Sequence, residues 1–163
     1  MSAAEGSNDA EVFVVYTGPR GAAVPRDVVR VRVDPSVTSI PDDAFYEHKK
    51  LTEVELCEGL VEIGDRSFAH CCHSIRKLII PNSLRRIRDG AFACSLRTPF
   101  RLHDGIESIG TNAFGDYIFT NFRVPPLITE IPDAMLYNCK SIFSIKLPYH
   151  LTEISNQLHL VII

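Results

Sequence analysis

Several common features are missing from this sequence of 163 residues, and each absence narrows its class. No apolar run approaches the roughly 18 residues that a membrane-spanning helix needs. The opening residues, MSAAEGSNDAE, have neither the positive start nor the apolar stretch of a secretory signal. No Asn-x-Ser/Thr sequon occurs, and the five cysteines are an odd number without the spacing of a disulfide framework. We therefore expect a cytoplasmic protein, with the nucleus as the alternative location.

The motifs of common enzymes are missing as well. There is no Gly-x-Ser-x-Gly and no glycine-rich loop that ends in Lys-Ser or Lys-Thr. Gly18-Pro-Arg-Gly21 is typical of a turn rather than of a phosphate-binding loop. The six histidines are scattered, and no nucleophile with a neighbouring base is visible. We therefore expect no enzyme activity, no catalytic residue and no cofactor.

What the sequence does contain is a repeat of 22 to 24 residues. The steps between its successive isoleucines are 23, 24, 22, 22 and 23 residues, the last one reaching Ile154. A fixed period in this range is typical of a solenoid, in which each coil buries its apolar side against its neighbours. In five copies a large apolar residue follows the isoleucine five residues later: Ile40/Phe45, Ile63/Phe68, Ile87/Phe92, Ile109/Phe114 and Ile131/Leu136.

Each copy has the pattern of one coil with three sides. Numbered from Val28, the coils have apolar residues at positions 4 and 6, and such alternation predicts one short half-buried strand. Proline follows directly at Pro81, Pro125 and Pro148, where the strand should end. The apolar positions 10 and 13 indicate a second extended segment, and an Asp, Asn or Thr before a small residue and an aromatic one predicts a short helical turn. The first strands of all six coils should stack into one parallel sheet.

The pattern L-x-x-I-x-L-P-x-x-L-x-x-I-x-x-x-A-F-x-x-C, seen at Ile75–Ser95 and Ile142–Ile154, resembles the BspA-like family of leucine-rich repeats. The resemblance covers about residues 28–154, although the asparagine ladder of other leucine-rich repeats is missing. It implies a β-rich α/β solenoid, a right-handed leucine-rich repeat coil with a stacked parallel sheet and short helical turns. It also implies protein–protein binding or cell-surface adhesion rather than catalysis. The missing signal peptide disfavours the adhesin-like alternative.

The chain divides into four parts. We expect a disordered N-terminus at 1–10, an N-terminal β cap at 11–27, the leucine-rich repeat solenoid of about six coils of 22–24 residues at 28–154, and a C-terminal cap or truncated tail at 155–163. The β-branched and aromatic run Val12–Tyr16 supports the cap, because the open end of a solenoid needs cover. At the other end, a capping strand and an exposed edge that allows self-association through the solenoid ends are equally open.

His70-Cys71-Cys72-His73 is a conspicuous cluster of metal-ligand residues. Zinc ligands usually come as pairs two to four residues apart that converge from two segments, and a second pair is missing. Cys71 and Cys139 occupy the same position of the coil, where the BspA-like family often carries cysteine. We therefore interpret these cysteines as buried structural residues and predict no metal site. A metal-binding or hydrolytic protein is the alternative.

The candidate binding residues occupy positions 3 and 5 of the coils, which point away from the core and form one surface along a solenoid. Position 5 is basic in four coils although the net charge is −3, and like charges stacked about 5 Å apart repel one another. We therefore predict a partner or a counter-charge there, with a merely solvated face as the competing interpretation. The expected partner is another protein, more specifically an acidic or phosphorylated one. The predicted partner-binding residues are Arg30, Arg32, Glu53, Glu55, Lys77, Ile79, Arg101, Arg123 and Lys146.

The third coil is the most basic, because it contains Arg85, Arg86 and Arg88. These charges suggest a second place for an anionic partner, including a nucleic acid. No aromatic residue alternates with the arginines, so the stacking surface that single-stranded nucleic acids require is missing.

Overall fold

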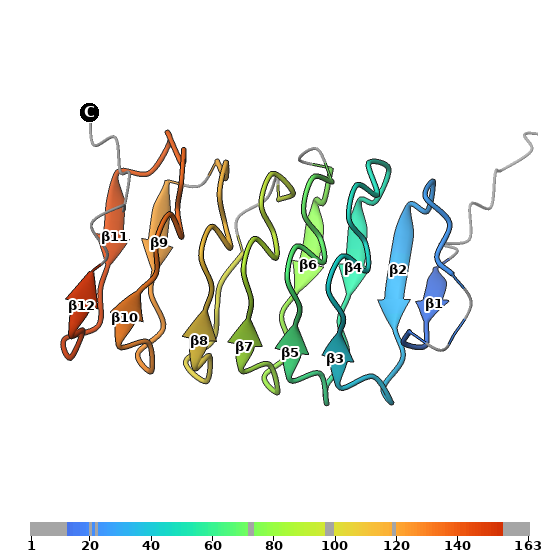
Figure 1. Ribbon diagram of the computed structural model, residues 1–163, viewed down its shortest axis with the longest axis horizontal. Helices are drawn as coiled ribbons and strands as arrows, with labels where there is room; N and C mark the ends of the chain where they lie inside the picture. Colours follow the sequence, from blue (N-terminus) through green and yellow to red (C-terminus); the bar gives the residue numbers. More distant parts are fainter. Residues whose placement is uncertain are drawn as a thin grey trace, which may run out of the picture.

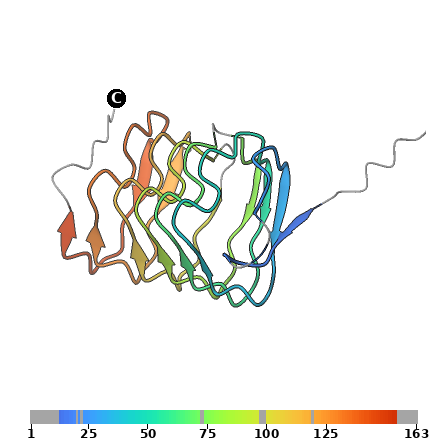
Figure 2. The same cartoon turned by 45° about the vertical axis from the view of Figure 1, so that its right-hand side comes forward.

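The structure is a computed structural model that describes residues 13–19, 21, 23–71, 74–96, 100–118 and 120–154. It is a solenoid whose coils stack along one axis (Figure 1, Figure 2), which confirms the predicted fold. The described residues form no helix, and hence none that could cross a membrane. We number the coils 1 to 6, for residues 28–50, 51–74, 75–96, 97–118, 119–141 and 142–154.

The first series of strands follows the predicted alternation. The strands are β1 (Val14–Tyr16), β2 (Arg30–Val33), β4 (Glu53–Glu55), β6 (Lys77–Ile79), β9 (Asn121–Arg123) and β11 (Ser144–Lys146). They pair in parallel in the order β1-β2-β4-β6, and β9 pairs separately with β11. Equivalent residues of successive coils lie opposite one another, as Val31 does with Val54. In β4 and β6 the middle residue is buried and its two neighbours point outward, as expected for a half-buried strand.

A second series of strands forms another side of the coils. These are β3 (Ser39–Ile40), β5 (Glu62–Ile63), β7 (Arg86–Ile87), β8 (Ser108–Ile109), β10 (Glu130–Ile131) and β12 (Glu153–Ile154). Their order is β3-β5-β7-β8, with β10 paired to β12. The isoleucine column that defines the repeat is paired coil to coil here, for example Ile40 with Ile63. The second extended segment is therefore confirmed.

The third side of each coil is a turn, and the predicted short helical turn is wrong. Coils 1 to 5 each place positions 16 and 20 in the left-handed region, as Asp43 at φ 56° and Glu47 at φ 58° illustrate. Between them the backbone bonds outward, because the N–H of Phe45 donates to the carbonyl of Ser67 in the next coil at 2.7 Å. We call these bonds, from positions 16, 18 and 20 of one coil to positions 15, 17 and 19 of the next, the turn ladder. Donors that a helix would pair locally thus link neighbouring coils instead.

A stack of phenylalanine rings fills the centre of the solenoid. Phe45, Phe68, Phe92 and Phe114 are fully buried and nearly parallel, with interplanar angles of 6°, 5° and 4°. Their centroids lie 4.9, 5.4 and 5.9 Å apart in chain order, so the spacing widens toward the C-terminal coils. Tyr16 of β1 meets Phe45 edge-on at 5.1 Å and closes the other end of the stack.

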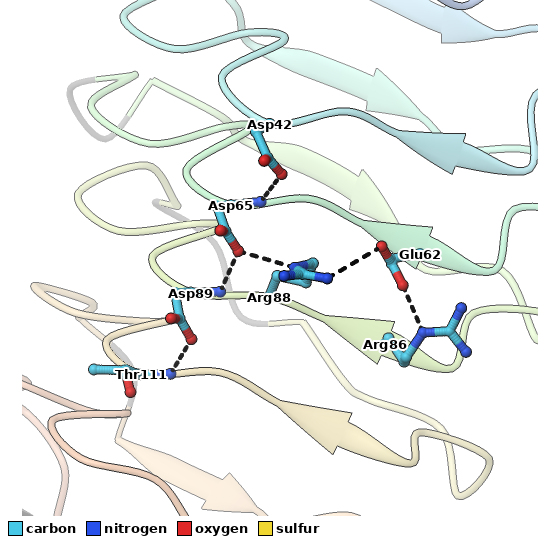
Figure 3. Close-up of polar contacts among 7 residues, drawn as sticks. All are labelled: Asp42, Glu62, Asp65, Arg86, Arg88, Asp89 and Thr111. Atoms are coloured by element: carbon cyan, nitrogen blue, oxygen red, sulfur yellow. Dashed lines mark hydrogen bonds and ion pairs between the residues drawn. The ribbon is translucent and has the colours of Figure 1, made fainter.

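A column of aspartates links the same turns through side chains (Figure 3). Oδ1 of Asp42 accepts a hydrogen bond from the backbone N–H of Asp65 at 2.7 Å, and Oδ1 of Asp65 accepts one from Asp89 at 3.2 Å. Oδ1 of Asp89 in turn accepts one from the N–H of Thr111 at 2.8 Å. Threonine replaces aspartate at this step and ends the series. This aspartate ladder ties coil to coil in a chain that lacks an asparagine ladder.

Both strand series are interrupted near coil 4, the first between coils 3 and 5 and the second between coils 4 and 5. Coil 4 has no strand in its described residues 100–102, so the first series breaks between β6 and β9. In the second series β8 does not pair with β10, and Figure 1 shows these strands farther apart than their neighbours. Within the described ranges, backbone hydrogen bonds from coil 4 to coil 5 come only from the turn ladder at Asn112, Phe114 and Asp116. The predicted continuous first sheet is therefore divided into a part in coils 1 to 3 and a part in coils 5 and 6, and the second series separates coils 1 to 4 from coils 5 and 6.

Pro132 removes one of the hydrogen bonds that the second series would need between coils 4 and 5. At its position in coils 2, 3 and 4, the backbone N–H donates to the isoleucine carbonyl of the preceding coil, as Gly64 does to Ile40 at 2.8 Å. Proline has no N–H, so the equivalent bond to the carbonyl of Ile109 cannot form. The aspartate ladder ends at Thr111 in the same step. Two independent links are thus missing between these coils.

Candidate interaction face

The outward residues of the first strand series form a surface that we call the strand face. It comprises the residues at positions 3 and 5 of the coils, where the sequence predicted the binding site. Ile79 is its one large apolar member among the predicted residues, with 54% of its surface exposed. The predicted residues lie as follows: Arg30 and Arg32 on β2, Glu53 and Glu55 on β4, Lys77 and Ile79 on β6, Arg123 on β9, Lys146 on β11, and Arg101 outside any strand.

The N-terminal half of the strand face neutralises its own charge. Arg30 lies 3.6 Å from Glu53, and Arg32 donates a hydrogen bond to Glu55 at 2.8 Å. Lys77 lies 3.8 Å from Glu53 and 3.5 Å from Glu55. The hydrogen bond from Arg32, together with the charges of Arg32 and Lys77, lowers the pKa of the Glu55 carboxyl. The two glutamates thus supply the predicted counter-charge, and no partner is needed in coils 1 to 3 to relieve repulsion.

The C-terminal half is less balanced. Arg123 forms an ion pair with Asp104, which lowers the pKa of that carboxyl, and the bond also raises the pKa of the Arg123 guanidinium. Arg101 and Lys146 are exposed, and neither has an ion pair with any residue of known placement. Three cations therefore follow one another along coils 4 to 6 with a single carboxylate partner.

A groove of about 600 Å³ lies between these cations. It forms where the segment at 100–102 leaves the sheet, so that coil 4 does not continue the strand surface. Phe122 is buried beneath it, and Phe100 packs 5.3 Å from Phe114, centroid to centroid. The groove is lined by Phe100, Arg101, Leu102, Thr120, Asn121, Phe122, Arg123, Ser144 and Lys146.

The basic third coil is already paired with acidic neighbours (Figure 3). Arg86 contacts Glu62 at 2.5 Å, and Arg88 contacts Asp65 at 3.1 Å and Glu62 at 3.7 Å. The bond to Asp65 raises the pKa of the Arg88 guanidinium. These arginines stabilise the stacking of coils 2 and 3, so they are poor candidates for an anionic partner.

The cysteines at position 21 serve the core. Cys71 and Cys139 are buried, and their thiols donate to the carbonyls of Phe45 at 3.5 Å and Phe114 at 3.3 Å in the preceding coils. Burial raises the pKa of the Cys139 thiol to about 11, which keeps it protonated and unreactive near neutral pH. The structural interpretation of these two cysteines therefore agrees with their environment.

The remainder of the His-Cys-Cys-His cluster, Cys72 and His73, lies outside the described residues. In the part of the chain with assigned positions, no group of three or more His, Cys, Asp or Glu side chains could hold a metal ion. The predictions for 1–10 and 155–163 also fall outside this part, so they stay predictions.

The repeat that builds these coils matches one family model. Six copies of the BspA type leucine rich repeat region match the chain, over residues 27–142 and 94–159. The chain belongs to the BspA-type leucine-rich repeat family. This confirms the family that the sequence pattern suggested.

Solved structures show the same architecture as this BspA-type chain. A leucine-rich repeat protein from Bacteroides ovatus is 28% identical, with a TM-score of 0.68 over 74% of this chain. The match spans 34% of the Bacteroides protein, about a third of its length. The leucine-rich repeat protein of T. pallidum is 20% identical, with a TM-score of 0.63 over 88% of this chain and 74% of that one. None of the curated proteins is detectably similar to this sequence.

Sequence reasoning missed two parts of this face in the BspA-type chain. Asp104 lies in a turn 19 residues before Arg123, a separation that differs from the repeat period, so no column of the repeat pairs them. The groove arises where the fourth coil leaves the sheet. Pro132, at the same junction of the second strand series, is visible in the sequence. Its effect could not be predicted, because that requires knowing which backbone N–H groups bond between coils.

Proposed function

We propose that this chain is a non-catalytic protein–protein interaction module that presents its strand face to a partner protein. The supporting observation is the contrast between a uniform core and a varied surface. Inward positions hold apolar residues in every coil, whereas positions 3 and 5 carry arginine, glutamate, lysine, isoleucine, asparagine and serine on the same backbone. A solenoid with varied residues along one rigid face is suited to binding an extended partner surface.

The family supports the same proposal. Leucine-rich repeat domains generally mediate protein interactions, and the fold keeps the strand face open to solvent while the middle residues of the same strands point inward and are buried in the core. Exposed Ile79 adds an apolar contact to an otherwise polar surface, a combination typical of interface centres. The cytoplasmic location expected from the sequence stays a prediction.

The test compares two surfaces of one protein. A strand-face variant carries Arg32→Ala, Ile79→Ala and Asn121→Ala, and its control carries Ser39→Ala and Ser108→Ala on the second strand series. All five side chains are exposed, and Glu55, which loses its bond from Arg32, keeps Lys77 as a partner, so both variants should fold, which circular dichroism would check. Affinity capture with quantitative mass spectrometry should show partners retained by the control and lost from the strand-face variant. Partners retained by both variants, or lost equally from both, would contradict the proposal.

A further inference from the structure

The two halves of the strand face differ in a way that indicates the chemistry of the partner. In coils 1 to 3, glutamates lie between the cations at contact distances of 2.8 to 3.8 Å. In coils 4 to 6, the groove lining contains Arg101, Arg123 and Lys146 and no carboxylate at all. Arg123 and Lys146 occupy paired positions of adjacent strands, so their side chains start about 5 Å apart. Asp104 pairs with Arg123 from a turn outside the groove lining, so Arg101 and Lys146 keep no carboxylate partner among the described residues, and an anionic ligand would neutralise them.

The groove also has the shape and floor of a binding site for an extended segment. Its lining comes from three consecutive coils, so a ligand in it can contact residues of coils 4, 5 and 6 at once. Phe100 and Phe122 lie at its floor, whereas Asn121 and Ser144 supply polar side chains at the strand surface. An extended peptide places alternate side chains on one side with a repeat of about 6.8 Å, which long arginine and lysine side chains can follow.

We propose that this groove binds an acidic, extended segment of the partner protein, with carboxylates paired to Arg101, Arg123 and Lys146. The inference rests on the proposed function and specifies which half of the strand face makes contact and what chemistry it recognises. The N-terminal half, with its charges paired internally, contributes little to this recognition.

A nucleic acid fits the groove less well. Single-stranded nucleic acids are held by bases stacked on exposed aromatic rings. Phe122 is only 8% exposed, and the ring of Phe100 packs at tilted angles against the rings of Phe114 and Tyr117, with centroids 5.3 and 5.7 Å apart. The groove therefore offers cations and hydrogen-bonding groups but no free stacking surface, which favours a carboxylate-rich peptide.

The experiment measures fluorescence anisotropy of the full chain with a labelled peptide of alternating glutamate and serine. A peptide of alternating glutamine and serine and a single-stranded oligothymidine are the comparison probes. The chain should bind the glutamate peptide, should not bind the glutamine peptide, and should bind more weakly as salt is raised. Tighter binding of the oligothymidine than of the glutamate peptide would overturn the inference.

Variants test whether the three groove cations are responsible. R101E/R123E/K146E should weaken binding of the glutamate peptide by about tenfold or more. The matched control, K49E/K50E/R76E, makes the same change in net charge at exposed residues of coils 1 to 3 and should leave the affinity within about twofold. Circular dichroism establishes that both variants are folded. Equal loss in the two variants would mean that net charge alone attracts the peptide, and the inference would be wrong.

The results separate this inference from the proposed function. If the Arg32/Ile79/Asn121 alanine variant loses its captured partners while the glutamate peptide does not bind, the strand face is an interaction surface but its partner is not acidic. If the peptide binds through the three cations while captured partners ignore the strand face, the basic groove is a site for acidic peptides and the wider strand-face proposal fails.

Discussion

Two buried serines in neighbouring coils should respond in opposite ways to replacement by alanine. Ser95 is 1% exposed, and its hydroxyl donates to the carbonyl of Phe68 and accepts from the N–H of Cys71 at 3.4 Å. Ser67 is also fully buried, but its hydroxyl has no hydrogen-bond partner within the described ranges. Alanine occupies the position of Ser67 in coils 1, 3 and 4.

The expected magnitudes follow from the contacts. Ser95→Ala removes the Ser95 hydrogen bonds of two buried backbone groups of coil 2, the carbonyl of Phe68 and the N–H of Cys71, and each such loss costs about 1 to 3 kcal/mol. Because one of the two bonds is long, we expect the free energy of unfolding to fall by about 2 to 3 kcal/mol in total. Ser67→Ala removes a buried hydroxyl that makes no bond, so stability should rise by about 0.5 to 1 kcal/mol. In a chain of this length, each kcal/mol changes Tm by about 2 to 4 °C.

Urea and thermal unfolding, followed by circular dichroism, would measure both changes. Ser95→Cys is the matched control, because cysteine occupies this position in coils 2 and 5 and its thiol donates to the equivalent carbonyl. It should be less destabilising than Ser95→Ala, since a thiol is a weak donor that still reaches the carbonyl. The reasoning is refuted if Ser67→Ala and Ser95→Ala shift Tm in the same direction by similar amounts.

Three further predictions concern other links between coils. The pKa of the Cys139 thiol is about 11 in the folded chain against an ordinary value of 9.0. The stability that the buried neutral thiol contributes is therefore complete below pH 9 and is lost as the pH rises toward 11. Urea unfolding should show a loss of about 2 to 3 kcal/mol over that range, smaller in Cys139→Ala. Asp89→Ala removes an acceptor for the N–H of Thr111 and should lower Tm by about 2 to 4 °C. Asp89→Asn keeps an acceptor at this position and should lower Tm by less. Hydrogen exchange at the amides of Thr129 and Glu130 should be at least about tenfold faster than at the equivalent amides of coil 4, which donate to coil 3.

Each of these predictions has a result that would contradict it. Equal pH dependence in the wild type and Cys139→Ala would mean that the buried thiol does not titrate with unfolding. Equal destabilisation by alanine and asparagine at Asp89 would exclude a role for the side-chain acceptor. Comparable exchange rates in coils 4 and 5 would show that these coils are bonded in solution as tightly as the others.

The repeat period and the buried columns could be predicted from the sequence because every coil repeats the same contacts. An isoleucine or phenylalanine that recurs every 22 to 24 residues has one consistent place in a stack, and the structure puts it there. The third side of the coil could not be predicted in the same way. A residue such as Asp43 before a small residue and a phenylalanine fits a helix start and a left-handed turn equally well. The choice between them depends on hydrogen bonds to the next coil, which local sequence does not reveal.

The charges of the strand face were predictable as a column but not as pairs. Reading position 5 alone emphasises four basic coils, whereas the sheet register places Glu53 and Glu55 between Arg30, Arg32 and Lys77. Strand neighbours in both directions therefore determine whether a charge is free. The pair formed by Arg123 and a turn aspartate has no repeat signal, because it joins residues at different positions of adjacent coils.

The junction between coils 4 and 5 is the step with the fewest backbone hydrogen bonds among the described residues, because only the turn ladder crosses it. The position of coils 5 and 6 against coil 4 therefore depends more on side-chain contacts than at any other step. Arg123 supplies one of these contacts through its ion pair with Asp104. An anionic partner in the groove would compete with Asp104 for the same guanidinium, so binding there and the link between coils 4 and 5 would be coupled.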